Sequence, residues 1–73
     1  MDVYCVLWKN DNHAIYDVEV RQSLAKAKKL AVDILNDWGY DVESYEDIQK
    51  EEIQEELKEK TEDVKVVRRK VVS

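Results

Sequence analysis

Residues 23–39 read SLAKAKKLAVDILNDWG, and this stretch decides the fold. Its apolar residues recur at steps of three and four, which is the period of an amphipathic helix. The stripe consists of Leu24, Ala27, Ala31, Leu35 and Trp38, and it is widened by Leu30 and Ile34. Ser23 is placed to cap the first turn, and Gly39 to end the helix in a left-handed conformation with Tyr40 covering the last turn. The spacing therefore predicts a helix with one apolar face.

Two strands are expected before this helix. Met1 to Lys9 is apolar on both faces (Val3, Tyr4, Cys5, Val6, Leu7 and Trp8), which suits a central strand or a sheet whose second face meets a partner. Asn10 to His13 are turn formers that should close a hairpin. Ala14 to Arg21 alternates, with Ala14, Tyr16, Val18 and Val20 on one face and Asp17, Glu19 and Arg21 on the other. This pattern predicts a half-buried strand with one wet side.

A second helix is predicted from an N-cap at Ser44, with Asp47 in capping-box spacing, to about Lys60. It should turn Tyr45, Ile48, Ile53 and Leu57 toward the core. Val64 to Val72 is rich in valine and predicts a third strand, although Val64 and Val66 share a face that Val67 and Val71 do not. A bulge near Arg68, or continuation as helix, are the alternatives.

These elements predict an α+β fold of order ββααβ in a single compact domain, residues 1–73. A small three-stranded sheet, antiparallel or mixed, would be covered on one face by two helices. So short a chain cannot bury all of its apolar strand residues behind two helices. We therefore expect a homodimer that hides strand surfaces including Trp8, or Val67 and Val71.

The sequence offers little for catalysis. Its only glycine ends a helix, so there is no phosphate-binding loop, and its single histidine, His13, lies in a predicted turn. The single cysteine, Cys5, is interpreted as a small buried hydrophobe. We expect no enzyme activity, no cofactor and no metal. Because no apolar run could span a bilayer and no signal peptide precedes the first strand, we expect a cytoplasmic protein that does not bind membranes.

Charge is distributed very unevenly along the chain. Residues 33–63 hold thirteen of the seventeen acidic residues against Lys50, Lys58 and Lys60, a net charge of −10. Residues 64–73 hold Lys65, Arg68, Arg69 and Lys70 and no acid, a net charge of +4. Such asymmetry concerns partners and association rates rather than fold.

The acidic block contains a predicted row of carboxylates. On a continuous helix Asp47, Glu51, Glu55 and Glu59 would align, with Glu52 and Glu62 flanking them and Asp37 and Asp41 extending the charge. Steps of four residues rise about 6 Å, close to the length that two phosphates of one DNA strand span. Like charges at this spacing disfavour the helix slightly. The row is therefore a candidate surface for binding a protein groove that normally holds nucleic acid.

The chain resembles the small acidic early proteins with which lytic phages of Gram-positive bacteria disable their host. The likeness covers its size, its opening strand (residues 3–8) and its Glu/Asp-dense helix (residues 46–59). The resemblance implies a dimeric DNA mimic that inhibits a basic host DNA-binding protein, such as the nucleoid protein HU or the sliding clamp, in the bacterial cytoplasm.

Two other interpretations stay open. The acidic helix face is also typical of a solvated surface in a small dimeric interaction domain. The basic residues of the tail could instead hold a phosphate backbone and make the protein a weak nucleic-acid binder, or could pair with acidic residues of the same or a neighbouring subunit. Because the net charge is −5, we expect no binding to duplex DNA at physiological salt.

Overall fold

The predicted first helix is present as α1, Leu24–Asp37. The structure, a computed structural model, describes residues 1–10 and 15–72. The Ser23 side chain caps the first turn by accepting a hydrogen bond from the Lys26 N–H at 3.1 Å. At the other end Gly39 has φ +97°, and the Tyr40 N–H donates to the Leu35 carbonyl at 3.0 Å. These two features form the left-handed helix ending that the sequence predicts.

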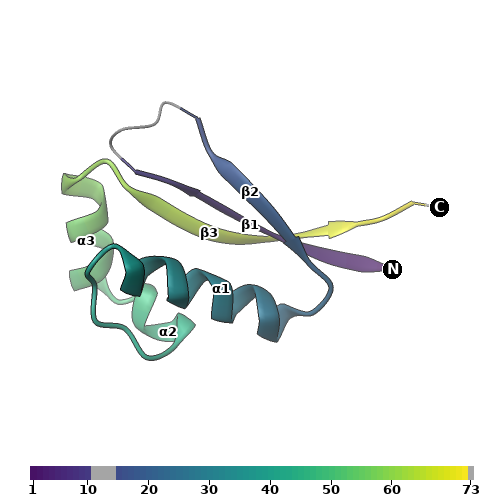
Figure 1. The fold of residues 1–73 in the computed structure, drawn as a ribbon, viewed down its shortest axis with the longest axis horizontal. Helices are drawn as coiled ribbons and strands as arrows, with labels where there is room; N and C mark the ends of the chain where they lie inside the picture. Colours follow the sequence, from purple (N-terminus) through teal and green to yellow (C-terminus); the bar gives the residue numbers. More distant parts are fainter. Residues whose placement is uncertain (11–14, 73) are drawn as a thin grey trace.

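The described strands form one antiparallel sheet in the order β2-β1-β3 (Figure 1). They are β1 (Asp2–Lys9), β2 (Asp17–Arg21) and β3 (Asp63–Lys70). The central position of β1 agrees with its apolar residues on both faces. The predicted hairpin turn at 10–13, with His13 and the neighbouring Ala14, lies largely outside the described residues.

The third strand is regular throughout. Its pairing with β1 runs without a break from Asp2 opposite Lys70 to Lys9 opposite Asp63. The alternatives of a bulge near Arg68 and of a helix are therefore wrong. An uninterrupted ladder places Val64 and Val66 on one face of the sheet and Val67 on the other.

The predicted second helix is not continuous. It is divided into α2 (Tyr45–Ile48) and α3 (Glu51–Glu59), because Lys50 is extended, with φ −65° and ψ 142°. Ile48 and Leu57 are nine residues apart, so about 100° per residue would put them on opposite sides of one helix. The break lets both enter the same core, where they are 0% and 2% exposed. Gln54 supports the junction by donating from Nε2 to the Ile48 carbonyl at 2.5 Å.

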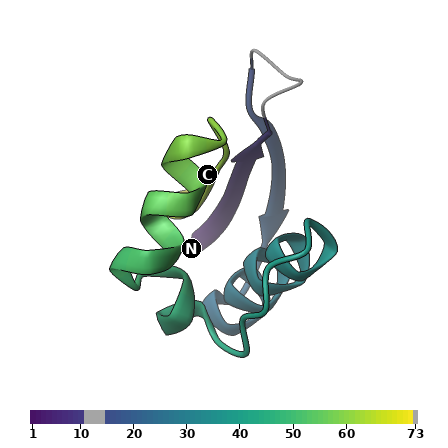
Figure 2. The same cartoon turned by 90° about the vertical axis from the view of Figure 1, so that its left-hand side faces the viewer.

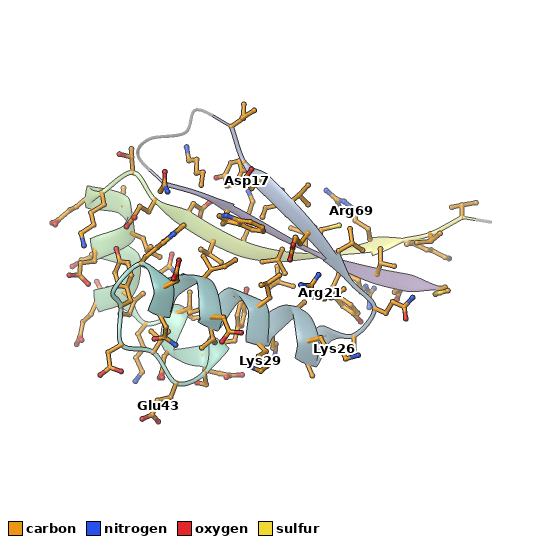
Figure 3. The ribbon with its side chains drawn as sticks, in the orientation of Figure 1. Asp17, Arg21, Lys26, Lys29, Glu43 and Arg69 are labelled. Atoms are coloured by element: carbon orange, nitrogen blue, oxygen red, sulfur yellow. The ribbon has the colours of Figure 1, made fainter. Side chains whose placement is uncertain are left out.

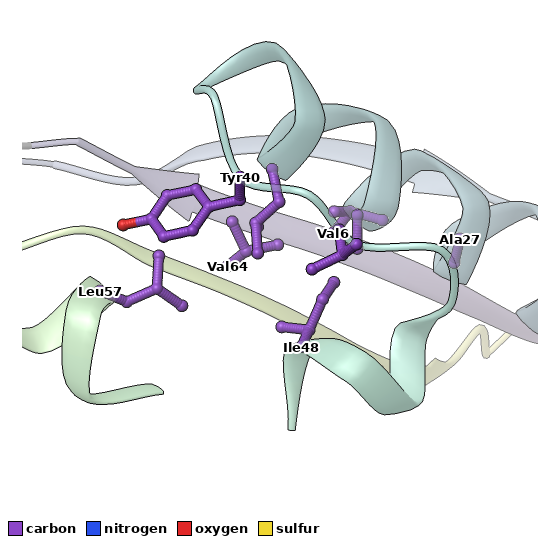
Figure 4. Close-up of a cluster of buried hydrophobic side chains, with 9 residues drawn as sticks. Val6, Ala27, Tyr40, Ile48, Leu57 and Val64 are labelled. Atoms are coloured by element: carbon purple, nitrogen blue, oxygen red, sulfur yellow. The ribbon is translucent and has the colours of Figure 1, made fainter. Parts of the chain in front are cut away.

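The core lies between the sheet and the helices (Figure 4). The sheet contributes Val6 and Val64, and α1 contributes Ala27, Ala31 and Leu35. The connection after α1 contributes Tyr40 and Val42, α2 contributes Ile48, and α3 contributes Leu57. Trp8 and Trp38 are partly buried and pack against this cluster. The α+β fold with one helix-covered face is thus confirmed, with three described helices instead of two.

The other side of the sheet carries no helix of the described chain (Figures 1 and 2). Directly paired residues share a face, and successive residues of a strand alternate between the two faces, so the residues next to Val6 and Val64 along their strands turn outward. We call this the open sheet face; its apolar residues are Val3, Cys5, Leu7, Val18, Val20 and Val67.

Two predictions about strand faces are corrected here. The apolar face of β2 was expected to be half-buried, yet Val18 and Val20 are 57% and 53% exposed. Their partners are Leu7 and Cys5 of β1, which point away from the helices. Trp8, expected at a dimer interface, lies instead on the helix-covered side, where it packs on the core.

Candidate protein-binding surface

The exposed side of α3 carries most of the predicted carboxylate row. Ile53 and Leu57 anchor the helix to the core, and Glu51, Glu55 and Glu59 are exposed on its outer side. We call the exposed carboxylates of α2, α3 and the segment before them the acidic helical surface: Asp41, Glu43, Glu46, Glu51, Glu52, Glu55, Glu56 and Glu59.

Asp47 does not continue the row, because the break at Lys50 separates it from α3. Its carboxylate accepts hydrogen bonds from the N–H groups of Glu43 and Ser44, at 3.0 and 3.3 Å, and lies 3.0 Å from Lys50 Nζ. The pKa of Asp47 is lowered below its usual value, mainly by the hydrogen bond from the Glu43 N–H and next by the contact with Lys50. Its charge therefore stabilises the start of α2 and is partly neutralised within the molecule.

Glu62 also has a partner within the chain. The Tyr40 hydroxyl, on a side chain that is 7% exposed, donates to Glu62 Oε1 at 2.8 Å. Burial, followed by this bond to Glu62, raises the pKa of Tyr40 well above its ordinary value. Lys60 Nζ lies 4.9 Å from the centre of the same ring. Glu62 thus ties the residues after α3 to the end of α1.

The predicted acids divide into two groups around α3. Glu51, Glu55 and Glu62 line one open hollow with Gln54, Leu57, Lys58 and Asp63. Asp41, Asp47 and Glu52 line another with Val42, Glu43, Lys50 and Ile53. Glu59 is exposed at the last position of α3, and Asp37 is exposed at the last position of α1. The structure therefore brings six of the eight predicted acids to the two flanks of one helix.

Lysines of α1 limit the acidic surface on its other side. Figure 3 shows Lys26 and Lys29 along α1 and Glu43 on the connection that leads to α2. Lys28 Nζ lies 3.8 Å from Glu46 and 5.6 Å from the centre of the Tyr45 ring, and Lys29 pairs with Asp33 at 3.4 Å. The charge is mixed between α1 and α2, whereas acidic residues dominate the outer side of α3. Sequence reasoning missed this boundary, because it depends on how α2 packs beside α1 after the connection between them.

The basic residues of β3 do not form one stripe. Alternation along the strand places Lys65 and Arg69 on the open sheet face, and Arg68 and Lys70 on the other side. Arg68 Nε lies 3.8 Å from Asp2 of β1, so the one ion pair described for this tail joins it to its neighbouring strand. This division disfavours a phosphate-binding role for the tail.

Groups with catalytic or ligand-binding potential are sparse in the part of the chain that is described. Cys5 is only partly buried and lies on the open sheet face, which corrects its interpretation as a buried core residue. No set of three or more His, Cys, Asp and Glu side chains within residues 1–10 and 15–72 is arranged to hold a metal ion. Over the same ranges no helix has both the length and the apolar character needed to cross a membrane.

Comparison with known proteins leaves the surface to be judged on its own geometry. No family model, curated protein or solved structure matches this chain.

Proposed function

We propose that this protein is a non-enzymatic inhibitor that binds a basic, DNA-binding protein through its acidic helical surface and competes with DNA for that site. DNA-binding proteins such as HU and the sliding clamp present basic surfaces of this kind. The proposal places the protein in the cytoplasm, where those partners act.

The observation that supports this proposal is the exposed row of Glu51, Glu55 and Glu59 on α3. These residues are exposed and lie away from the core contacts of Leu57. Like charges at i,i+4 disfavour a helix by a few tenths of a kcal/mol per pair, so folding alone does not explain their choice. A partner with a positive groove would gain both faster encounter and specificity from them.

The test is competition between this protein and duplex DNA for purified basic DNA-binding proteins, HU and the sliding clamp among them. We expect the affinity to fall steeply as the salt concentration rises, mainly because association becomes slower. We also expect duplex DNA to displace the protein from its partner. The protein alone should give no gel shift with duplex DNA at physiological salt. A shift at sub-micromolar protein would instead favour a nucleic-acid binder.

A charge-matched pair of variants separates this surface from net charge. Glu51→Lys/Glu55→Lys should abolish binding, because it reverses the centre of the row. Asp17→Lys/Glu19→Lys makes the same change in net charge on exposed residues of β2 and should bind nearly as well as wild type. Equal binding by the first variant and the wild type would identify the acidic helical surface as a solvated face and refute the proposal.

A further inference from the structure

The open sheet face is an apolar surface that the described helices leave uncovered. It joins Val3, Cys5 and Leu7 of the central strand to Val18 and Val20 on one side and Val67 on the other. Exposed patches of contiguous apolar side chains on small proteins mark interaction surfaces more often than isolated exposed residues do. Its place opposite the helices keeps it separate from the acidic helical surface (Figure 1).

The charges at the ends of this face are complementary to each other. On β3, Asp63 lies at one end of the face and Arg69 at the other, and both share the face of Val67. Asp63 accepts a hydrogen bond from the Tyr16 hydroxyl at 2.5 Å, and Lys9 and Lys65 lie over the Tyr16 ring at the same end. Figure 3 shows Arg69 away from that end, near the N-terminal half of β1.

This arrangement matches itself when one copy is reversed. Val6 and Val66 are paired at the midpoint between Asp63 and Arg69. We consider a two-fold axis that passes through this midpoint, lies in the plane of the interface and runs perpendicular to the strands. Rotation about this axis places Asp63 opposite Arg69 of the second copy. It also places Cys5 opposite Leu7, and Val18 opposite Val20. Such reciprocal contacts are what a symmetric dimer requires.

The lysines of the face fit this arrangement as well. Lys65 would lie opposite Val67 of the second copy, where its aliphatic stem covers the valine while its ammonium group stays over the Tyr16 ring of its own copy. Lys9 would lie opposite Val3 in the same way. The reversed arrangement therefore keeps the lysines of one copy away from those of the other.

We propose that the open sheet face is the interface of a homodimer in which two copies pack sheet against sheet, in antiparallel orientation, about this axis. This inference is independent of the proposed function. Two strands of eight residues and one of five give a footprint of at most about 27 Å by 15 Å, before side chains beyond its edges are counted. Interfaces this small associate weakly, so we expect a dissociation constant in the micromolar range.

The first experiment is sedimentation velocity of the full chain from low to high micromolar concentration. The mass should rise from the 8.7 kDa of one chain to twice that value. Val18→Lys/Val20→Lys should stay monomeric, because Val18 lies opposite Val20 of the second copy and the change would bring lysines of the two copies face to face. Asp17→Lys/Glu19→Lys adds lysines to the same strand on its other side and should still dimerise. Circular dichroism would verify that both variants are folded, as expected for changes at exposed residues.

The second experiment tests the orientation. Asp63→Arg and Arg69→Asp should each weaken association about tenfold, because each brings like charges together across the interface. The double variant exchanges the charges and should recover to within about threefold of wild type, although it lacks the Tyr16–Asp63 bond.

Three results would overturn the proposal. They are a monomer at every concentration, a Val18→Lys/Val20→Lys variant that dimerises like wild type, and a double charge exchange no better than the single changes. A protein that stays monomeric and binds a different partner through this face would also overturn the proposal.

Discussion

Valines lie on both sides of the sheet, but in opposite surroundings. Val6 and Val64 on the helix-covered side are 0% and 4% exposed, whereas Val18 and Val20 on the open side are 57% and 53% exposed. Valine is favoured on both sides because a branched side chain suits a pleated surface. The comparison teaches that an apolar strand pattern predicts the strand, but not which side the rest of the chain will cover.

The cause is the amount of chain available for a second layer. The described helices α1, α2 and α3 supply one layer, and their apolar residues are used on one face of the sheet (Figure 2). A domain of this size buries only about 60% of the surface of its unfolded chain. A second apolar face is therefore left uncovered by the described helices, and the predictions below test the difference between the two sides.

The largest effect is expected from removing core volume on the covered side. Leu35→Ala truncates a side chain that is 0% exposed and should lower the free energy of unfolding by about 3 to 4 kcal/mol. Leu7→Ala makes the same chemical change on the open face, where it should cost about 1 kcal/mol. Urea denaturation at low protein concentration measures both without a contribution from association. Equal losses would contradict the assignment of Leu7 to an uncovered face.

The next effect tests how α2 and α3 both reach the covered side. Glu51→Pro places proline at the first residue of α3 after an extended Lys50, where proline is tolerated, and should cost less than about 1 kcal/mol. Glu55→Pro lies inside α3 and should cost about 3 kcal/mol or more. Thermal and urea unfolding compare the two variants. A large loss in Glu51→Pro would mean that the helix is continuous.

A smaller effect is expected from two tyrosine–carboxylate bonds, one on each side. Tyr40→Phe removes a bond from a buried ring to Glu62 and should cost about 1 kcal/mol. Tyr16→Phe removes the bond to Asp63 on the open face and should cost less, because water replaces it readily.

The Tyr40 bond also predicts a dependence on alkaline pH. The pKa of Tyr40 is raised in the folded state, so its contribution is complete below the unfolded value of about 10 and is lost as the pH rises further. The stability of wild type should therefore fall more steeply above pH 10 than that of Tyr40→Phe. Parallel pH curves for the two proteins would refute this role.

The smallest effect concerns Asp47, whose carboxylate stabilises the start of α2 on the helix-covered side of the sheet. Its pKa is lowered in the folded state, so its contribution is present above the unfolded value of about 3.9 and is lost as the pH falls through the lower folded value. Asp47→Asn should be less stable than wild type at neutral pH, and the difference should shrink in acid. Asp41→Asn, a change at an exposed aspartate nearby, should have less effect at neutral pH. Unfolding curves measured at several pH values test this prediction. A difference in stability between wild type and Asp47→Asn that is the same at every pH would contradict it.

Much of the fold could be predicted from local signals. Ser23 and Gly39 bound α1 as expected, because capping depends on neighbouring backbone groups. The division of the second helix was missed, although Ile48 and Leu57 cannot share one side of a continuous helix. That spacing was readable in the sequence, and only the assumption of one helix concealed it.

The candidate surface was predictable in part. The exposure of Glu51, Glu55 and Glu59 follows from the position of Leu57 on the same helix. The bonds of Asp47 to Glu43 and Lys50, and of Glu62 to Tyr40, depend on where the chain turns. Charge alone did not distinguish carboxylates that serve the fold from those left exposed.

By itself, the sequence determined the strands, α1, the capping of α1 and α2 and the concentration of acid in residues 33–63. These depend on side-chain period and on contacts within a few residues. Only the tertiary structure decided that Trp8 lies under the helices while Cys5 and Val18 remain on the open face. The physical reason is that a strand's alternation defines two faces equally, and the choice between them is made by helices that pack from elsewhere in the chain.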